Sequence, residues 1–156
     1  MKKKIILLSI IFLILDIIIK LLIENNLSLY EKIIIIPSFF NITKTYNTGA
    51  AWSILSGSRV FLILIGIVVL VFLSLFMKEF KQSKLCTISF SMLYAGIIGN
   101  LIDRLIYGHV IDYLDFYIFG YDYPVFNLAD IFIVLGCILL TICIIKKGDK
   151  NENKSR

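Results

Sequence analysis

The chain has 156 residues, of which 59% are hydrophobic and only 17% are charged. Soluble domains carry roughly 25% charged residues, so this composition excludes an ordinary water-soluble fold and predicts one integral membrane domain over residues 1–156. The net charge of +5 comes from lysine clusters without interleaved aromatic residues, which argues against a nucleic-acid partner.

Four apolar segments are long enough to cross a membrane. A bilayer core of roughly 30 Å requires about 20 residues of α-helix. Helices are therefore predicted over residues 5–23, 60–77, 85–107 and 127–145. This pattern indicates an all-α membrane protein with four transmembrane helices.

The distribution of lysine predicts the orientation of these helices. An even number of spans places both termini on one side of the membrane, and Lys78, Lys81 and Lys84 fall on that side as well. Lysine and arginine are enriched in cytoplasmic loops. Both termini of this multi-pass protein are therefore expected in the cytoplasm, with residues 24–58 and 108–126 outside.

The first apolar segment follows three lysines, as in a secretory signal, but it lacks a small-residue cleavage site. Asp16 and Lys20 interrupt it, so we expect a retained first helix. These residues are four apart with the acid first, which is the favourable order for an ion pair on one helix face. The pair is interpreted as structural or orienting, with Lys20 extending toward the outer interface.

The first outer segment contains a predicted strand. Residues 39–46 alternate between two faces, which is strand periodicity, and Asn47-Thr48-Gly49 is a turn signal. Trp52 is suited to the membrane interface. We therefore expect a small extracytoplasmic β-sheet on the outer surface.

The third predicted helix carries small and polar residues on one face. The residues that share this face, at the spacing i, i+3, i+4 and i+7, are Gly96, Gly99, Asn100 and Asp103. Ala95 and Gly99 also form a small-xxx-small pair that permits close helix approach. Polar groups inside a membrane are costly and often functional, so this face is either a packing seam with satisfied polar groups or part of a site.

Two aspartates are expected at the outer end of the helix bundle. Asp112 follows the third helix, and Asp130 lies three residues after Asn127, as in a capping box at the start of the fourth helix. Because adjacent helices run in opposite directions, both carboxylates are expected at the same depth. Two carboxylates in a partly dry site can share a proton and activate water. Asp115 and Asp122 are interpreted as solvated loop acids.

Other chemistries have little support in the sequence. Cys86, Cys137 and Cys143 lie in or beside apolar segments without metal-ligand spacing, and we interpret them as packing residues rather than as a disulfide framework. His109 is the single histidine, which excludes a zinc-protease motif with paired histidines. Neither a metal nor an organic cofactor is expected.

Five motifs occur in the order found in a known family. They are Asp16-x-x-x-Lys20, Asn47-x-Gly49-Ala50-Ala51-Trp52, Gly99-Asn100-x-x-Asp103-Arg104, Val110-Ile111-Asp112-Tyr113 and Pro124-x-Phe126-Asn127-x-Ala129-Asp130. On the predicted topology, the chain resembles the lipoprotein signal peptidases (type II signal peptidases) of bacteria over nearly its whole length. Each motif alone is weak, whereas five in order are highly specific.

The resemblance implies an intramembrane aspartic endopeptidase of the bacterial inner or plasma membrane. Such an enzyme removes the signal peptide from a prolipoprotein by cutting before the diacylglyceryl-modified lipobox cysteine. It implies Asp112 and Asp130 as the catalytic pair, with the base left unassigned. The implied supporting residues are Asn47, Asn100, Arg104, Asn127, Asp16, Asp103 and Gly99. The implied partners are prolipoproteins and membrane lipid, and the implied enzyme is a monomer whose outer sheet cradles substrate beside a mobile aromatic loop.

Two other classes of function are open on the sequence alone. A small ion or proton transporter would use Asp16, Asp103 and Asp130 as a relay at successive depths. A non-catalytic membrane scaffold would depend on no single carboxylate. The paired acids at the outer boundary and the lack of obvious repeat symmetry in the sequence favour the peptidase.

Overall fold

The computed structural model describes residues 2–50, 54–80 and 83–152, with side chains of the last helix described up to residue 146. Its helices are α1 (Lys2–Asn26), α2 (Arg59–Phe76), α3 (Lys84–Ile106) and α4 (Leu128–Glu152), and a 3-10 turn, η2 (Met77–Glu79), follows α2. All four helices are long and apolar enough to span a membrane, as predicted. Trp52, expected at the membrane interface, and Lys81 of the lysine cluster lie outside the described residues.

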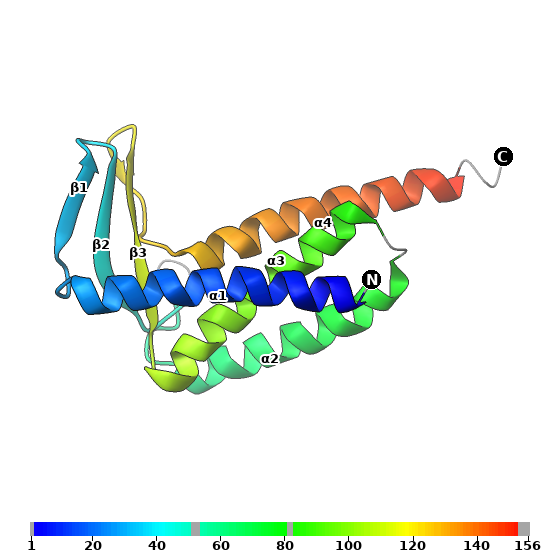
Figure 1. Ribbon diagram of the computed structural model, residues 1–156, viewed down its shortest axis with the longest axis horizontal. Helices are drawn as coiled ribbons and strands as arrows, with labels where there is room; N and C mark the ends of the chain where they lie inside the picture. Colours follow the sequence, from blue (N-terminus) through cyan, green and yellow to red (C-terminus); the bar gives the residue numbers. More distant parts are fainter. Residues whose placement is uncertain (1, 51–53, 81–82, 153–156) are drawn as a thin grey trace.

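The central helix of the bundle is α3. It packs against α4, α1 and α2, and Figure 1 shows it running obliquely across the bundle. Most of α3 is buried, whereas large apolar side chains of α1, α2 and α4 face outward. Outward-facing apolar side chains on helices with internally satisfied backbones are what a bilayer requires, since its core offers no water to exposed polar groups.

Glycines allow the neighbouring helices to approach α3 closely. A Cβ atom at Gly96 would overlap the backbone carbonyl oxygen of Ala129 on α4, and a Cβ at Gly136 would lie 2.7 Å from Cγ of Leu93. Membrane helices associate through close packing, because lipid is as apolar as their side chains. The small-residue face predicted on the third helix therefore does serve as a packing seam against α4.

A four-stranded antiparallel sheet lies at one end of the bundle (Figure 1). Its strands, in spatial and sequence order, are β1 (Lys32–Ile36), β2 (Phe40–Asn47), β3 (Val110–Ile118) and β4 (Tyr121–Asp122). β2 confirms the strand predicted over residues 39–46. The other strands were not predicted, so the fold is mostly helical with a sheet rather than all-α.

Strand pairing buries one acid that was interpreted as solvated. Asp115 of β3 is 1% exposed, and its Oδ2 lies 2.9 Å from Nζ of Lys32 and accepts a hydrogen bond from Nδ2 of Asn41 at 3.2 Å. The interpretation of Asp115 as a loop acid is therefore wrong, because β3 places it beside β1 and β2. Asp122 is exposed, as expected.

An apolar cluster joins the sheet to the end of the bundle. It consists of Ile23 and Leu27 at the end of α1 together with Ile111 and Tyr113 of β3, all buried. Because β3 follows α3 directly, this cluster fixes the segment on either side of Asp112 against the helices. The sheet therefore positions one of the two predicted catalytic residues.

Cys86 near the start of α3 and Cys143 near the end of α4 form a disulfide, with their Cα atoms 5.9 Å apart. Both belong to a buried apolar cluster, so their interpretation as packing residues is confirmed. The expectation of no disulfide is wrong, because α3 and α4 pack antiparallel and bring together residues 57 positions apart. Cys137 is free and exposed, so it is not a packing residue.

Candidate active site

The two predicted catalytic aspartates come from β3 and α4. Asp112 is 2% exposed and pairs with Thr45 of β2 in the sheet register, while Asp130 lies in the first turn of α4. Asn127 contacts both side chains. Its Nδ2 donates to Oδ1 of Asp112 at 2.6 Å, and its backbone N–H donates to Oδ2 of Asp130 at 3.1 Å. The fold therefore brings both carboxylates to one shared residue.

Asn127 and Asp130 form the reciprocal cap predicted for the start of α4. The N–H of Asp130 donates to Oδ1 of Asn127 at 3.0 Å, while the carboxylate of Asp130 accepts the N–H of Asn127. This is the pattern of a capping box. The cap holds the Asp130 side chain at the positive end of the helix dipole, where a negative charge is favoured.

Three asparagine side chains surround the two carboxylates. Asn47 at the end of β2 donates to Oδ2 of Asp112 at 3.0 Å, and Asn100 of α3 donates to Oδ1 of Asp130 at 2.7 Å. Asn127 also donates to Oδ1 of Asn100 at 3.2 Å. As a result, each of the four carboxylate oxygens accepts an N–H donor, and the network fixes the direction in which each acid points.

Arg104 of α3 positions the turn that follows Asn47. Its Nη2 donates to the carbonyl oxygen of Gly49 at 2.7 Å, and its Nη1 donates to that of Asn100 at 3.2 Å. The N–H of Gly49 in turn donates to Oδ1 of Asn47 at 2.9 Å. The guanidinium therefore orients Asn47 through this turn, and its charge acts electrostatically on Asp112 and Asp130.

Lys20 also belongs to this network, and the sequence did not predict that role for it. Its Nζ lies 3.0 Å from Oδ2 of Asp16 and 2.9 Å from Oδ2 of Asp103. The same Nζ donates to Oδ1 of Asn100 at 3.1 Å. Lys20 is 3% exposed, so the expectation that it extends to the interface is wrong. A signal was available, since Asp103 shares a helix face with Asn100 and a buried carboxylate requires a cation nearby.

Asp16 ties α1 to the start of α4. Its Oδ1 accepts the N–H of Ala129 at 3.0 Å, and its pairing with Lys20 confirms the predicted ion pair on one helix face. Gly99 makes room for this contact, because a Cβ there would lie 2.5 Å from Oδ2 of Asp16. Asp16 and Gly99 thus help to fix the position of α4, although neither contacts Asp112 or Asp130 directly.

Tyr113 is a second residue that sequence reasoning missed. Its phenolic oxygen accepts the N–H of Leu128 in the first turn of α4 at 3.1 Å, and its ring is buried. The contact satisfies a backbone donor that the helix itself leaves free. No local sequence signal identifies it, because it depends on β3 lying across the start of α4.

Asp112 is poised to hold a proton near neutral pH. Burial raises the pKa of its carboxyl from the ordinary 3.8 to about 7, the charge of Asp130 adds to the increase, and hydrogen bonds from Asn47 and Asn127 oppose it. Carboxylates that share one proton allow one to act as a base while the other acts as an acid. The arrangement is therefore suited to activating water for hydrolysis.

Comparison with known proteins gives concordant matches. Residues 8–146 match the family described as signal peptidase (SPase) II. The chain is 41% identical to the lipoprotein signal peptidase of Staphylococcus haemolyticus (strain JCSC1435) over 145 residues, which are 92% of each chain. It is 38% identical to the lipoprotein signal peptidase of Staphylococcus aureus over 150 residues, which are 96% of this chain and 92% of that protein.

Two solved structures share the fold. One, described as a bacterial membrane enzyme determined by the in meso method at 2.3 Å resolution, is 38% identical, with a TM-score of 0.85 over 94% of this chain and 90% of that chain. A second structure with the same description, at 1.9 Å resolution, is 39% identical, with a TM-score of 0.81 over 91% and 92%. The likeness therefore covers the helices and the sheet together.

Proposed function

The chain belongs to the signal peptidase II family and is a multi-pass bacterial membrane enzyme, and from this premise we propose that Asp112 and Asp130 are its catalytic pair. Its substrates are prolipoproteins, from which it removes the signal peptide by cutting before the diacylglyceryl-modified lipobox cysteine. In this proposal both termini are cytoplasmic, and the sheet lies on the outer side of the membrane and cradles the substrate. One copy of the chain, surrounded by lipid, is sufficient for activity.

The reaction begins with one ionised and one protonated carboxyl. Asp130 lies at the positive end of α4, where one of its donors is the backbone N–H of Asn127, while burial raises the pKa of Asp112 to about 7. We therefore assign Asp130 as the base and Asp112 as the acid. Asp130 takes a proton from a water molecule, and the oxygen of that water attacks the carbonyl carbon of the scissile peptide bond. Asp112 gives its proton to the carbonyl oxygen at the same time.

The tetrahedral intermediate then collapses with the opposite proton transfers. One of its hydroxyl groups returns a proton to Asp112 as the carbonyl re-forms and the carbon–nitrogen bond breaks. Asp130 delivers the proton taken from water to the leaving amine. One water molecule is consumed for each peptide bond, and both carboxyls return to their starting states.

The observation that carries this proposal is the contact of Asn127 with both carboxylates, within a network that gives every carboxylate oxygen a donor. Such a network holds two acids ready to act on one bond without reorganisation. The direct test is incubation of the purified protein with a diacylglyceryl-modified prolipoprotein. We expect cleavage before the modified cysteine, and a folded protein that leaves this substrate intact would contradict the proposal.

The transporter alternative is not favoured. Asp16 and Asp103 are both held by Lys20, so these three groups form one buried ion cluster. A proton relay needs carboxylates at successive depths, whereas these two carboxylates converge on a single ammonium group.

The cleavage rate should fall as the pH rises above about 7, by about tenfold per pH unit. Asp112 must carry a proton to act as the acid, and burial together with the charge of Asp130 raises its pKa to about 7. The measurement is kcat/KM for prolipoprotein cleavage as a function of pH, because this ratio reports the ionisation of the free enzyme.

Two variants test whether Asp112 causes this alkaline decline. Asn47→Ala removes a hydrogen bond that lowers the pKa of Asp112, so the decline should move to higher pH. His109→Gln removes a second titratable group, an imidazole ring packed on Tyr46 whose pKa is lowered by burial. The decline should survive that change. Its loss in His109→Gln, or an unmoved decline in Asn47→Ala, would exclude Asp112 as the acid.

The proposed orientation predicts a labelling pattern. A cysteine introduced at Ser83, just before α3, should not react with a membrane-impermeant maleimide added to sealed spheroplasts, and it should react once they are permeabilised. A cysteine at Asp122, an exposed residue of β4, should react without permeabilisation. The parent chain measures the background of its own cysteines. Reversed labelling of the two sites would overturn the orientation.

A further inference from the structure

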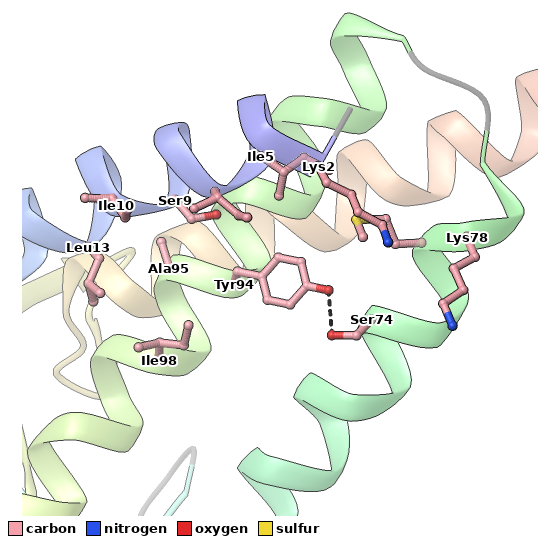
Figure 2. Close-up of a pocket in the computed structure, with 12 residues that line it drawn as sticks. Lys2, Ile5, Ser9, Ile10, Leu13, Ser74, Lys78, Tyr94, Ala95 and Ile98 are labelled. Atoms are coloured by element: carbon pink, nitrogen blue, oxygen red, sulfur yellow. Dashed lines mark hydrogen bonds between the residues drawn. The ribbon is translucent and has the colours of Figure 1, made fainter.

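A groove of about 450 Å³ lies between α1, α2 and α3, in the half of the bundle that contains the start of α1 (Figure 2). Since α2 packs mainly against α3, the side of α1 that faces α2 remains open. The apolar wall of the groove is formed by Ile5, Ile6, Ile10, Leu13, Met77 and Ile98. A hydrogen-bonded contact of 2.9 Å between Ser74 and Tyr94 joins α2 to α3 along it.

Two lysines lie at the end of this groove. Lys2 of α1 and Lys78 of η2 both line it and are both exposed, and Figure 2 shows them at the same end of the groove. The described residues that line the groove include no aspartate or glutamate. An apolar channel in a transmembrane region with two cations at its mouth is complementary to an amphiphile with an apolar tail and an anionic head.

A buried hydroxyl lies deeper in the same groove. Ser9 is 9% exposed, and its Oγ has no hydrogen-bond partner among the described residues. A helical serine commonly donates to the carbonyl oxygen four residues earlier, as Ser74 does. For Ser9 that acceptor would be the carbonyl oxygen of Ile5, but no such bond is formed. The Ser9 hydroxyl is therefore a donor that lacks an acceptor.

We propose that this groove is a binding site for an anionic phospholipid. The phosphate lies between Lys2 and Lys78, an acyl chain fills the apolar wall, and an ester carbonyl oxygen accepts the hydrogen bond from Ser9. Ser9 lies seven residues after Lys2, or about 10 Å further along α1. The order of groups along the groove thus matches the order in a phospholipid, with the phosphate nearest the water and the esters deeper.

The signal peptide of a substrate fits this groove less well. Signal peptides begin with a positively charged segment. In the proposed orientation that segment lies on the cytoplasmic side of the membrane, where it would meet Lys2 and Lys78. Like charges placed together in a partly desolvated site disfavour binding. The charge of the groove therefore selects a phospholipid over the substrate.

Native mass spectrometry of the full-length protein in detergent tests the proposal. The protein is titrated with phosphatidylglycerol or with phosphatidylcholine carrying the same acyl chains. We expect one phosphatidylglycerol to bind at least about tenfold more tightly than phosphatidylcholine, because the choline cation of the latter is repelled by the two lysines and offsets the attraction of its phosphate. This readout is binding and not cleavage, so its outcome is independent of the proposed peptidase mechanism.

Variants localise the effect. Lys2→Gln/Lys78→Gln should remove the preference for phosphatidylglycerol, whereas Lys3→Gln/Lys146→Gln, an equal loss of charge at exposed lysines outside the groove, should retain it. Ser9→Ala should weaken both lipids several-fold without lowering thermal stability. Equal binding of the two lipids, an equal loss in both double variants, or one-for-one displacement of the lipid by a signal peptide would overturn the proposal.

Discussion

Asp112→Asn and Asp130→Asn should each abolish prolipoprotein cleavage, a loss of at least about 10²–10⁴-fold, while the protein still inserts and folds. Asparagine has nearly the same shape as aspartate, but its amide can neither take a proton from water nor supply an acidic one. Burial penalises the charged form of Asp112, so the gain from a neutral side chain there offsets the loss of one of its two accepted hydrogen bonds. At Asp130 the lost part of the cap should cost about 1 kcal/mol.

The matched control for these variants is Asp122→Asn, which changes an exposed carboxylate of β4 and should leave the rate unchanged. Asp115→Asn, expected from the sequence to be equally harmless, should instead lower stability, because Asp115 is buried against Lys32 and Asn41. The measurement is cleavage per folded enzyme together with the thermal transition. A near wild-type rate in Asp112→Asn or Asp130→Asn would eliminate the aspartic dyad.

Lys20→Met should destabilise the protein by about 3–5 kcal/mol, because it leaves the carboxylates of Asp16 and Asp103 buried without their cation. Cleavage should fall in the fraction that remains folded as well, since Asn100, which donates to Asp130, loses one of the two donors at its own Oδ1. The measurements are the thermal transition in detergent and kcat per folded enzyme.

Neutralising the two carboxylates that lose their cation should restore part of this stability. In Lys20→Met/Asp16→Asn/Asp103→Asn no unpaired carboxylate remains in the cluster, and neutral replacements of buried ion groups are often tolerated. Lys3→Met, at an exposed position of the same helix, should change stability by less than about 0.5 kcal/mol. A triple variant no more stable than Lys20→Met would show that the ion cluster is not the source of the effect.

The parts of the fold that could be predicted from sequence are those with local causes. The helices follow from runs of about 20 apolar residues, and the cap at Asn127 and Asp130 lies within one helical turn. β2 was recognisable because its side chains alternate before a turn signal. In each case the residues that determine the structure are neighbours in the chain.

The parts that could not be predicted depend on contacts between distant segments. β3 lies beside β2 only because the sheet assembles on the end of the bundle, and Asp115 is buried for that reason. The Cys86–Cys143 pair requires the antiparallel packing of α3 and α4. Lys20 has a recognisable partner in Asp16, but its contact with Asn100 requires knowing which face of α3 meets α1.

The cap at the start of α4 determines when, during synthesis, the enzyme becomes able to cleave peptide bonds. Chains are made from the amino terminus, so α1, α2, α3 and the strand carrying Asp112 leave the ribosome before Asn127 and Asp130 do. Until α4 enters the membrane, Asp112 lacks the amide of Asn127, one of the two that orient it, and the second carboxylate. The nascent chain therefore has no proteolytic activity. That activity begins only when α4, the last transmembrane helix, has inserted and the bundle is complete.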